Sequence, residues 1–287
     1  MHLGDLILAK ILSSRKSRLH AKVLMCVKPA FLTSVVYTKS FGREILGVNV
    51  KTGLANPLKA TQKSLKQLPS GTLLKIDNLT NEITEVIGSL ADPFVDEKIS
   101  LAIYDKNDEF NEACKQQAAS FGSEVDEALY PQRVDLQHLP FCTIDPIDAK
   151  DFDDAIYFDV KERTLYVAIA DVSEYVSEYS PIDKEAKFRG FSIYFPHRSV
   201  PMLPRELSEN ICSLMPDLPR LAFVFKISLD ENLNPQKEEL FEAIIRSKRR
   251  YDYDEVDEIL RTRKAAEPEI LSWLLPLNEI CERLRRA

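Results

Sequence analysis

Residues 143–155 read T-I-D-P-I-D-A-K-D-F-D-D-A, an acidic stretch between two apolar runs at 139–142 and 156–158. Its five carboxylates belong to Asp145, Asp148, Asp151, Asp153 and Asp154. Like charges at this density repel one another unless a cation offsets them. Mg²⁺ takes oxygen ligands from one or two carboxylates and from substrate phosphates. We therefore expect an acidic loop between buried strands that supports metal-assisted phosphoryl chemistry.

The spacing of the aspartates predicts how this loop is folded. Asp151 and Asp153 lie two residues apart, so an extended backbone directs both to one side and Asp154 to the other. Bringing them together with Asp145 requires an irregular backbone, which Pro146 favours. The pattern predicts carboxylates gathered from a bent segment.

A calcium loop and a generic surface loop are the alternatives to a catalytic metal site in the acidic stretch. A calcium loop of the EF-hand type has glycine at its sixth position, but counting from Asp151 places Ile156 there. That interpretation is excluded. A generic acidic surface loop stays open, although it explains poorly why the carboxylates adjoin the apolar Ile144 and Phe152.

Length and composition limit the class of protein. A chain of 287 residues suggests two or three domains, and no apolar run approaches the roughly 18 residues of a membrane span. The apolar run at 6–12 is interrupted by Lys10, so we expect no signal peptide and no membrane contact. Five widely spaced cysteines without a C-x-x-C pair favour neither zinc nor disulfides, which fits a reducing cytoplasm.

Charge is divided unequally along the chain. Residues 1–91 carry 13 Lys/Arg and 5 Asp/Glu, a net charge of +8, and the remainder carries −15. A basic front could attract a polyanion while an acidic rear holds metal. The simpler interpretation, that both halves are well solvated, stays open.

The front of the chain is predicted to be rich in strands. Residues 1–29 suggest two strands joined by a basic loop at 13–18, a partial barrel. Residues 30–91 contain apolar stretches at 33–37, 45–50, 72–76 and 82–87 separated by turn signals. This is the size of a small oligonucleotide-binding (OB-like) β-barrel. Phe31, Tyr37 and Phe41 could stack on single-stranded nucleic acid, but for each we consider a place in the core more favourable.

Residues 92–138 predict a helical connector. Phe110, Cys114, Ala118 and Phe121 recur at helical spacing before Gly122. The segment 123–126 has the pattern of a capping box, which predicts a second helix that ends at 130–131.

From residue 139 an α+β domain is expected. Strands are predicted at 156–160 and 164–170, and a long hairpin at 221–229 and 238–247. Ser180 and Pro181 predict a helix start that Gly190 ends. Further helices are predicted from Pro204, over 253–260 and over 268–284, the last one kinked at Pro276.

The acidic stretch resembles the signature of the ribonuclease II/ribonuclease R family and its catalytic RNB domain. Other segments match the family in chain order: V-A-I-A-D-V (167–172), Y-F-P (194–196), P-M-L-P-R-E-L-S (201–208), C-S-L (212–214), I-R-S-K (245–248) and Y-D-E-V (253–256). Several ordered motifs are far more specific than one short pattern. The resemblance covers residues 139–287 strongly. Over residues 1–138 it is weaker, and there it implies cold-shock-like barrels at 1–29 and 30–91 and a connector at 92–138.

The resemblance implies an Mg²⁺-dependent, processive 3′→5′ exoribonuclease that hydrolyses single-stranded RNA to 5′-mononucleotides. By position, the family's metal and catalytic carboxylates fall on Asp145, Asp151, Asp153 and Asp154. We expect Asp145, Asp151 and Asp154 to bind metal and Asp151 and Asp153 to act in catalysis. Asp148 is given no ligand role, and Asp171 a structural one.

Two tyrosines are implied to contact RNA. Tyr194 matches the aromatic that stacks on the 3′-terminal base, and Tyr253 matches the tyrosine that lines the RNA path. From spacing alone, both would be interpreted as core residues.

The chain departs from the family pattern at its end. The RNB domain of the family continues past residue 287 with a glutamate, an active-site arginine and a C-terminal barrel. We therefore expect a fragment of a larger, monomeric enzyme, closer to the ribonuclease R branch, with RNA-degradation partners such as a helicase. The alternative is a non-catalytic RNA-binding fragment, and a metal-binding structural domain is a third, weaker alternative.

Overall fold

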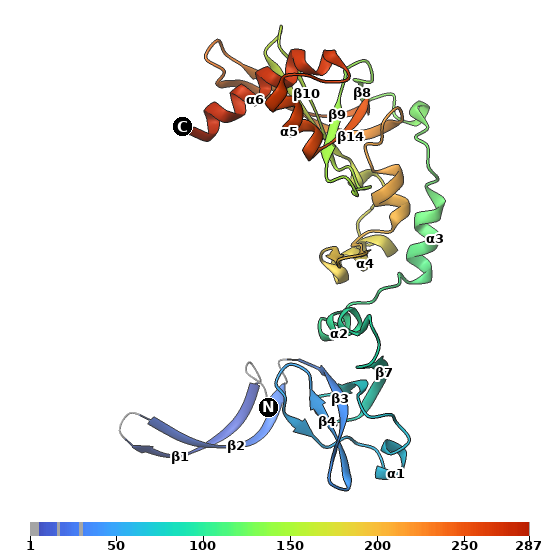
Figure 1. The fold of residues 1–287 in the computed structure, drawn as a ribbon, viewed down its shortest axis with the longest axis vertical. Helices are drawn as coiled ribbons and strands as arrows, with labels where there is room; N and C mark the ends of the chain where they lie inside the picture. Colours follow the sequence, from blue (N-terminus) through green and yellow to red (C-terminus); the bar gives the residue numbers. More distant parts are fainter. Residues whose placement is uncertain (1–5, 16–17, 29–30, 287) are drawn as a thin grey trace. The chain divides into compact units, whose positions relative to one another are not determined.

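The computed structural model describes residues 6–15, 18–28 and 31–286 (Figure 1). The chain divides into two compact units, Met1–Glu109 and Phe110–Ala287. No helix in the described ranges is both long and apolar enough to cross a membrane. All five cysteines are free thiols.

The first unit begins with an antiparallel ribbon of two strands, β1 (Leu6–Arg15) and β2 (Arg18–Lys28). Pairing continues to Arg15 opposite Arg18, so the basic loop predicted at 13–18 is shorter than expected. The turn residues 16–17 lie outside the described residues. Because residues alternate between the two faces of a strand, a single apolar face cannot form from runs such as 6–8, and those residues are exposed.

The rest of this unit is the expected OB-like sheet, with strand order β5-β4-β3-β6-β7. Its elements are β3 (Thr33–Phe41), β4 (Glu44–Asn49), β5 (Ala55–Asn56), β6 (Thr72–Asp77) and β7 (Ile83–Ser89), with the helices α1 (Gln62–Leu65) and α2 (Val95–Ile103). No helix was predicted at α1, and α2 falls within the helical connector predicted at 92–138, although its bounds were not predicted. Val36 packs with Leu65 on one face of the sheet, and Val35 packs with Val95 on the other. Both faces of β3 are therefore covered.

Two aromatic residues of this unit that were assigned to the core are instead exposed. Phe31 and Phe41 expose 58% and 45% of their surface, whereas Tyr37 packs against the core as expected. The Lys51 ammonium lies 5.6 Å from the centre of the Phe31 ring and 5.2 Å from that of Tyr104. The core assignment of Phe31 and Phe41 was wrong: Phe31 lies two residues before β3, and Phe41 is the last residue of that strand.

The second unit begins with α3 (Glu112–Ser120), which starts after the N-cap Asn111 as the spacing predicted. The predicted capping box at 123–126 was wrong. Asp126 accepts the backbone N–H of Ala128 and begins only one 3₁₀ turn, η1 (Glu127–Leu129). Pro131 follows within two residues, and a proline disfavours helical backbone in the residue before it.

A seven-stranded sheet forms the centre of this unit, in the order β16-β9-β10-β11-β14-β15-β8. Its strands are β8 (Val134–Asp135), β9 (Cys142–Asp145), β10 (Asp154–Asp159), β11 (Thr164–Ala170), β14 (Pro219–Leu229), β15 (Pro235–Arg246) and β16 (Arg249–Asp252). The two edge pairings, β16 with β9 and β15 with β8, are parallel, and the others are antiparallel. The β10–β11 turn and the β14–β15 hairpin lie where they were expected.

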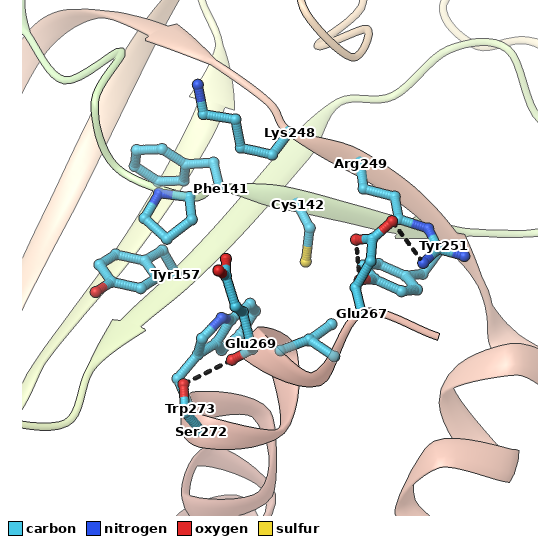
Figure 2. Close-up of a pocket in the computed structure, with 12 residues that line it drawn as sticks. Phe141, Cys142, Tyr157, Lys248, Arg249, Tyr251, Glu267, Glu269, Ser272 and Trp273 are labelled. Carbon is cyan, nitrogen blue, oxygen red and sulfur yellow. Dashed lines mark hydrogen bonds and ion pairs between the residues drawn. The ribbon is translucent and has the colours of Figure 1, made fainter. Parts of the chain in front are cut away.

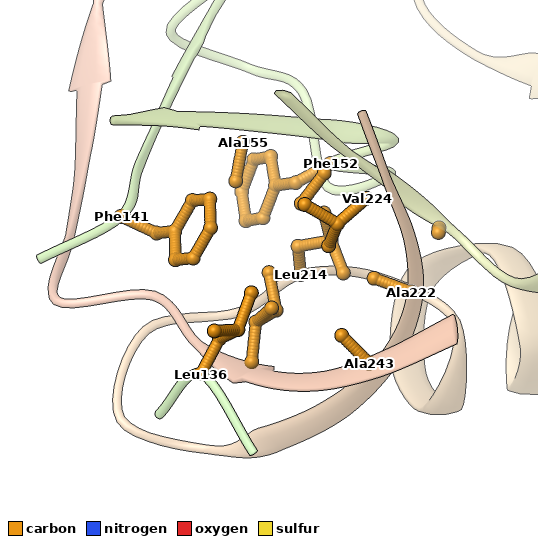
Figure 3. Close-up of a cluster of buried hydrophobic side chains, with 11 residues drawn as sticks. Leu136, Phe141, Phe152, Ala155, Leu214, Ala222, Val224 and Ala243 are labelled. Atoms are coloured by element: carbon orange, nitrogen blue, oxygen red, sulfur yellow. The ribbon is translucent and has the colours of Figure 1, made fainter. Parts of the chain in front are cut away.

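The two faces of this sheet are covered differently. One face packs around Phe141, Phe152, Ala155 and Leu214 (Figure 3). The other is covered by α5 (Tyr253–Thr262) and by α6 (Leu271–Arg286), which follows the 3₁₀ turn η4 (Pro268–Ile270). Alternate residues of β9 and β10 therefore pack into different cores. The acidic stretch connects these two strands, so it lies at one end of the sheet.

The remaining elements cap the sheet near that end. They are η2 (Val172–Glu174), α4 (Pro181–Arg189), β12 (Ile193–Tyr194), β13 (Ser199–Val200) and the wide helical turn η3 (Leu207–Ile211). The predicted caps of α4 are confirmed, since Ser180 accepts the N–H of Asp183 and Gly190 has φ 78°. The Cys212 N–H reaches the Leu207 carbonyl at 3.0 Å, five residues back.

Candidate active site

The acidic stretch opens onto a cavity of about 800 Å³ within the second unit. One wall carries Asp145, Asp148, Asp151 and Asp153. The facing wall is formed by Ser192, Tyr194–Ser199, Pro201 and Arg205, with Ser208 and Glu209 of η3. Segments that are about 40 to 60 residues apart in sequence therefore form one acidic, aromatic and cationic cavity.

The backbone of the loop decides which carboxylates face the cavity. Phe152 is buried in the core, so its neighbours Asp151 and Asp153 both line the cavity, as their spacing predicted. Asp145 lines it from the end of β9. Asp154, the first residue of β10, is exposed but does not line the cavity.

The surroundings of the Asp145 carboxylate favour a cation beside it. Desolvation is the largest cause that raises the pKa of Asp145, and the charges of Asp154 and Asp151 raise it further, while Arg250 opposes them. The Thr143 hydroxyl is near enough to lower this pKa, but its Oγ and Asp145 Oδ2 are both buried without a hydrogen-bond partner among the described residues. An unpaired buried carboxylate oxygen is costly, so a cation is a favourable ligand for it.

Asp153 lies where several like charges meet. Desolvation is again the largest cause that raises the pKa of Asp153, followed by the charges of Asp151, Asp154 and Asp145. The residue is exposed by surface area, because it borders the cavity, yet protein atoms surround it closely enough to reduce its hydration. A cation near these carboxylates would relieve both effects.

The candidate ligands suit Mg²⁺ by their chemical type, but too few of them lie together to hold the ion without other ligands. All candidate ligands are carboxylate oxygens, the type that Mg²⁺ prefers. Among the described residues, no three His, Cys, Asp or Glu side chains lie close enough to hold a metal ion by themselves. Mg²⁺ is usually held by one or two carboxylates, with waters and substrate phosphates as the other ligands, so the residues present fit this ion.

The two tyrosines expected at the RNA are both on the surface. Tyr194 exposes 72% of its surface on the cavity wall, and Tyr253 exposes 56% at the first residue of α5. Tyr253 does not line the cavity, but it follows Asp252, which pairs with Asp145 between β16 and β9. The core interpretation of these aromatics was therefore wrong.

Sequence reasoning missed the cationic part of the facing wall. Arg198 and Arg205 both line the cavity, and Arg205 pairs with Glu209 and donates to the Ser199 carbonyl at 2.8 Å. Arg205 lies within the P-M-L-P-R-E-L-S segment (201–208) that matches the family, but no role was predicted for this residue. Asp171, in contrast, has the predicted structural role, because it is buried with Arg133.

A second cavity, of about 420 Å³, lies beside β16 and α6 (Figure 2). Arg249 in its lining is paired with Glu255 and Glu267, and the Ser272 hydroxyl donates to the Glu269 backbone carbonyl. Burial raises the pKa of the Cys142 thiol there to about 12, so the thiol stays protonated at neutral pH. No aspartate of the acidic stretch lines it, so the first cavity is the better candidate.

Two known domain families match the chain. The RNB domain family matches residues 133–287, more than half of the chain. The chain belongs to the RNB-domain family. The ribonuclease R second OB domain matches residues 35–101 of the same chain, so an OB-like domain precedes the RNB domain as expected.

Several curated relatives of the chain are ribonucleases R. Ribonuclease R of Helicobacter pylori (strain ATCC 700392 / 26695) is 38% identical over 257 residues, which are 88% of this chain and 39% of the relative. Ribonuclease R of Escherichia coli (strain K12) is 39% identical over 183 residues, 63% of this chain and 22% of the relative. This RNB-family chain therefore spans about two fifths or less of these relatives.

Solved structures agree on the fold. Mycoplasma genitalium RNase R in complex with ribose-methylated single-stranded RNA has a TM-score of 0.77 and 30% identity over 92% of this chain and 44% of that chain. Yeast Ssd1, a pseudonuclease, has a TM-score of 0.70 at 16% identity over 95% of this chain and 36% of that chain. The RNB-family fold is thus shared by a protein without nuclease activity, so the fold alone does not establish catalysis.

Proposed function

We propose that this chain carries the catalytic carboxylates of an Mg²⁺-dependent 3′→5′ exoribonuclease that degrades single-stranded RNA processively to 5′-mononucleotides. The observation that carries the proposal is the cavity in which Asp145, Asp151 and Asp153 face an aromatic and cationic wall. That arrangement offers oxygen ligands on one side and groups for a base and a phosphate on the other. The similarity of 88% of the chain to a ribonuclease R supports the same reaction.

Each residue has a part that its position supports. Of the candidate ligands Asp145, Asp151 and Asp154, one or two would bind Mg²⁺ directly, because no three acidic side chains among the described residues lie close enough to hold an ion. Asp154 does not line the cavity, but its charge acts on Asp145 and Asp153. The ion, when bound, would polarise the phosphoryl oxygen and lower the pKa of its water. Asp153 supplies negative charge at the centre of the cluster. Tyr194 offers an exposed ring on which a 3′-terminal base can stack, and Tyr253 offers another near the end of β9.

RNA is the proposed substrate because two ribonuclease R structures similar to this chain contain RNA. One holds ribose-methylated single-stranded RNA and the other holds double-stranded RNA. Both are about 30% identical to this chain. We further propose a cytoplasmic, monomeric protein that works with an RNA-degradation partner such as a helicase.

A non-catalytic RNA-binding role is the second candidate. It is favoured by the exposed Phe31 and Tyr104 rings beside the Lys51 ammonium, a combination that suits bases and phosphates. It is also compatible with a chain that spans 39% of its relative. Under this role the chain binds RNA in a salt-sensitive way without forming product.

One gel separates the two candidates. A 5′-labelled single-stranded RNA incubated with the protein and Mg²⁺ is expected to be shortened from the 3′ end to a short labelled end product, with few intermediates because degradation is processive. No shortening is expected when EDTA replaces Mg²⁺. A salt-sensitive band shift without shortening would instead support the binding role. With a 3′-labelled RNA, labelled fragments longer than a mononucleotide at the first time points would show cleavage at internal sites and contradict exonucleolytic cleavage.

Tyr194→Ala is expected to weaken binding of single-stranded RNA by about 5- to 160-fold, since stacking on an aromatic contributes about 1–3 kcal/mol per base. Tyr194→Phe keeps the ring and should bind within about twofold of the wild type. Fluorescence anisotropy with a labelled RNA in Ca²⁺ measures both. Tyr179→Ala is the matched control, because Tyr179 is 69% exposed in the same unit but outside the cavity. Equal affinities for the Tyr194→Ala and Tyr179→Ala variants would contradict stacking on Tyr194.

A further inference from the structure

A single serine holds the peptide backbone between the two central aspartates. The Ser213 hydroxyl donates to the Lys150 carbonyl at 2.8 Å and accepts the N–H of Phe152 at 3.1 Å. These two backbone groups flank Asp151 on either side. The Leu214 N–H adds a third bond, to the Phe152 carbonyl at 2.9 Å, next to Asp153. The backbone of both aspartates is therefore tied to residues 213–214.

The attachment is buried on both sides. Ser213 exposes 1% of its surface and Phe152 exposes 6%. Figure 3 shows the Phe152 side chain within the same core cluster as Ala155 and Leu214. With Phe152 pointing into the core, alternation directs Asp151 and Asp153 toward the cavity. Core packing sets the direction of the loop, and Ser213 holds its peptide groups.

Ser213 is itself held by a buried cation. The Arg220 Nε donates to the Ser213 carbonyl at 2.9 Å, and its Nη1 donates to the Pro219 carbonyl at 3.0 Å. Arg220 exposes 1% of its surface, at the second residue of β14. The sheet thereby supports the serine rigidly, as an outer partner of a functional site should be supported.

We infer that Ser213 is a positioning residue that fixes Asp151 and Asp153 in the direction required to hold a divalent cation. The inference rests on the proposed function for the identity of the cation, and on the hydrogen bonds above for the positioning. Ser213 touches neither the cavity nor any carboxylate oxygen in the described contacts. Its role is to keep the loop in one backbone conformation.

Removal of the hydroxyl takes away the partner of the buried Phe152 N–H and of the partly buried Lys150 carbonyl. The Phe152 N–H and the Lys150 carbonyl then lose their hydrogen bonds to residue 213. Buried groups without a partner are unfavourable, so the loop is expected to move toward water and populate other conformations. Carboxylates that are displaced in this way bind a cation less tightly.

The test is Ser213→Ala in the full chain, with two readouts. Hydrogen exchange of the Phe152 amide, measured without metal, is expected to be about tenfold faster than in the wild type. The Mg²⁺ affinity, measured by calorimetry without RNA, is expected to fall about tenfold or more, the range found for outer partners of metal sites. Ser213→Thr keeps the hydroxyl and should restore slow exchange.

Ser247→Ala is the matched control. Ser247 also exposes 1% of its surface, between β15 and β16, and its hydroxyl donates to one carbonyl, that of Arg249, at 3.3 Å. It should leave the Phe152 exchange rate and the Mg²⁺ affinity near the wild type. Unchanged exchange at Phe152 in Ser213→Ala, or a loss of affinity equal to that of Ser247→Ala, overturns the inference. If the wild type binds no Mg²⁺, the proposed metal chemistry fails, while faster exchange would still support the positioning role.

Discussion

Asp153→Asn is expected to lower RNA hydrolysis by at least about 10²–10³-fold while RNA affinity changes little. The substitution keeps the size of the side chain but removes a charge from the centre of the cluster, where Asp145, Asp151 and Asp154 all act on Asp153. Loss of one preorganised electrostatic group in an active site typically has an effect of this size. Affinity is retained because the aromatic and cationic wall of the cavity is untouched. Single-turnover hydrolysis and anisotropy measure the two effects separately.

The control for this prediction is Asp159→Asn. Asp159 ends the same strand, β10, at the end away from the cavity, and its carboxylate accepts the N–H of Glu162 at 3.0 Å. The same chemical change there should leave hydrolysis near the wild-type rate. Hydrolysis by Asp153→Asn at the rate of Asp159→Asn would contradict the catalytic assignment of Asp153. Parallel loss of RNA binding and hydrolysis would show that Asp153 acts in binding.

Elements that are specified by adjacent residues could be predicted from the sequence. The helix α4 begins after Ser180 and ends at Gly190 because the cap and the left-handed turn are properties of those residues. The β14–β15 hairpin was predicted for the same reason, since its turn and its apolar strands are local. Both were confirmed without knowledge of what they pack against.

Elements that depend on distant partners could not be predicted. β16 and β8 are short strands whose partners, β9 and β15, are about 100 residues away in sequence, and both pair in parallel. Four residues such as 249–252 carry no clear period of their own. The failed capping box at 123–126 has a related cause, since a local helix signal was overridden by the proline that follows.

The candidate site was predictable to the same extent. The acidic stretch identified one wall of the cavity, because its carboxylates are adjacent in sequence. It did not identify Arg198 or Arg205 on the facing wall, nor Ser213 behind the loop. These residues reach the site only through the fold of residues 190–214 over the end of the sheet. The sequence motifs identify the segments that form the site, whereas the contacts between these segments are known only from the fold.

Asp171→Ala is expected to lower the free energy of unfolding of the second unit by about 3–5 kcal/mol. The Arg133 Nη2 lies 2.6 Å from Asp171 Oδ2, with side-chain exposures of 1% and 2%. Removing the carboxylate leaves the guanidinium buried, with Glu174 at 2.9 Å as its nearest remaining charge. Asp171 also accepts the backbone N–H of Glu174 at 3.2 Å and so caps η2. Urea denaturation followed by Trp273 fluorescence measures the loss.

A double substitution distinguishes a charge effect from a packing effect. Arg133→Met combined with Asp171→Leu removes both buried charges, so it should be less destabilising than Asp171→Ala alone. Glu174 and Glu242 remain hydrated after this change, since 36% and 46% of their side chains are exposed. Glu258→Ala, which breaks the exposed ion pair with Arg261 on α5, should leave the free energy of unfolding nearly unchanged. If the double variant is as unstable as the sum of its single variants, the unpaired charge is not the cause, and the loss of packing around residue 171 explains the effect.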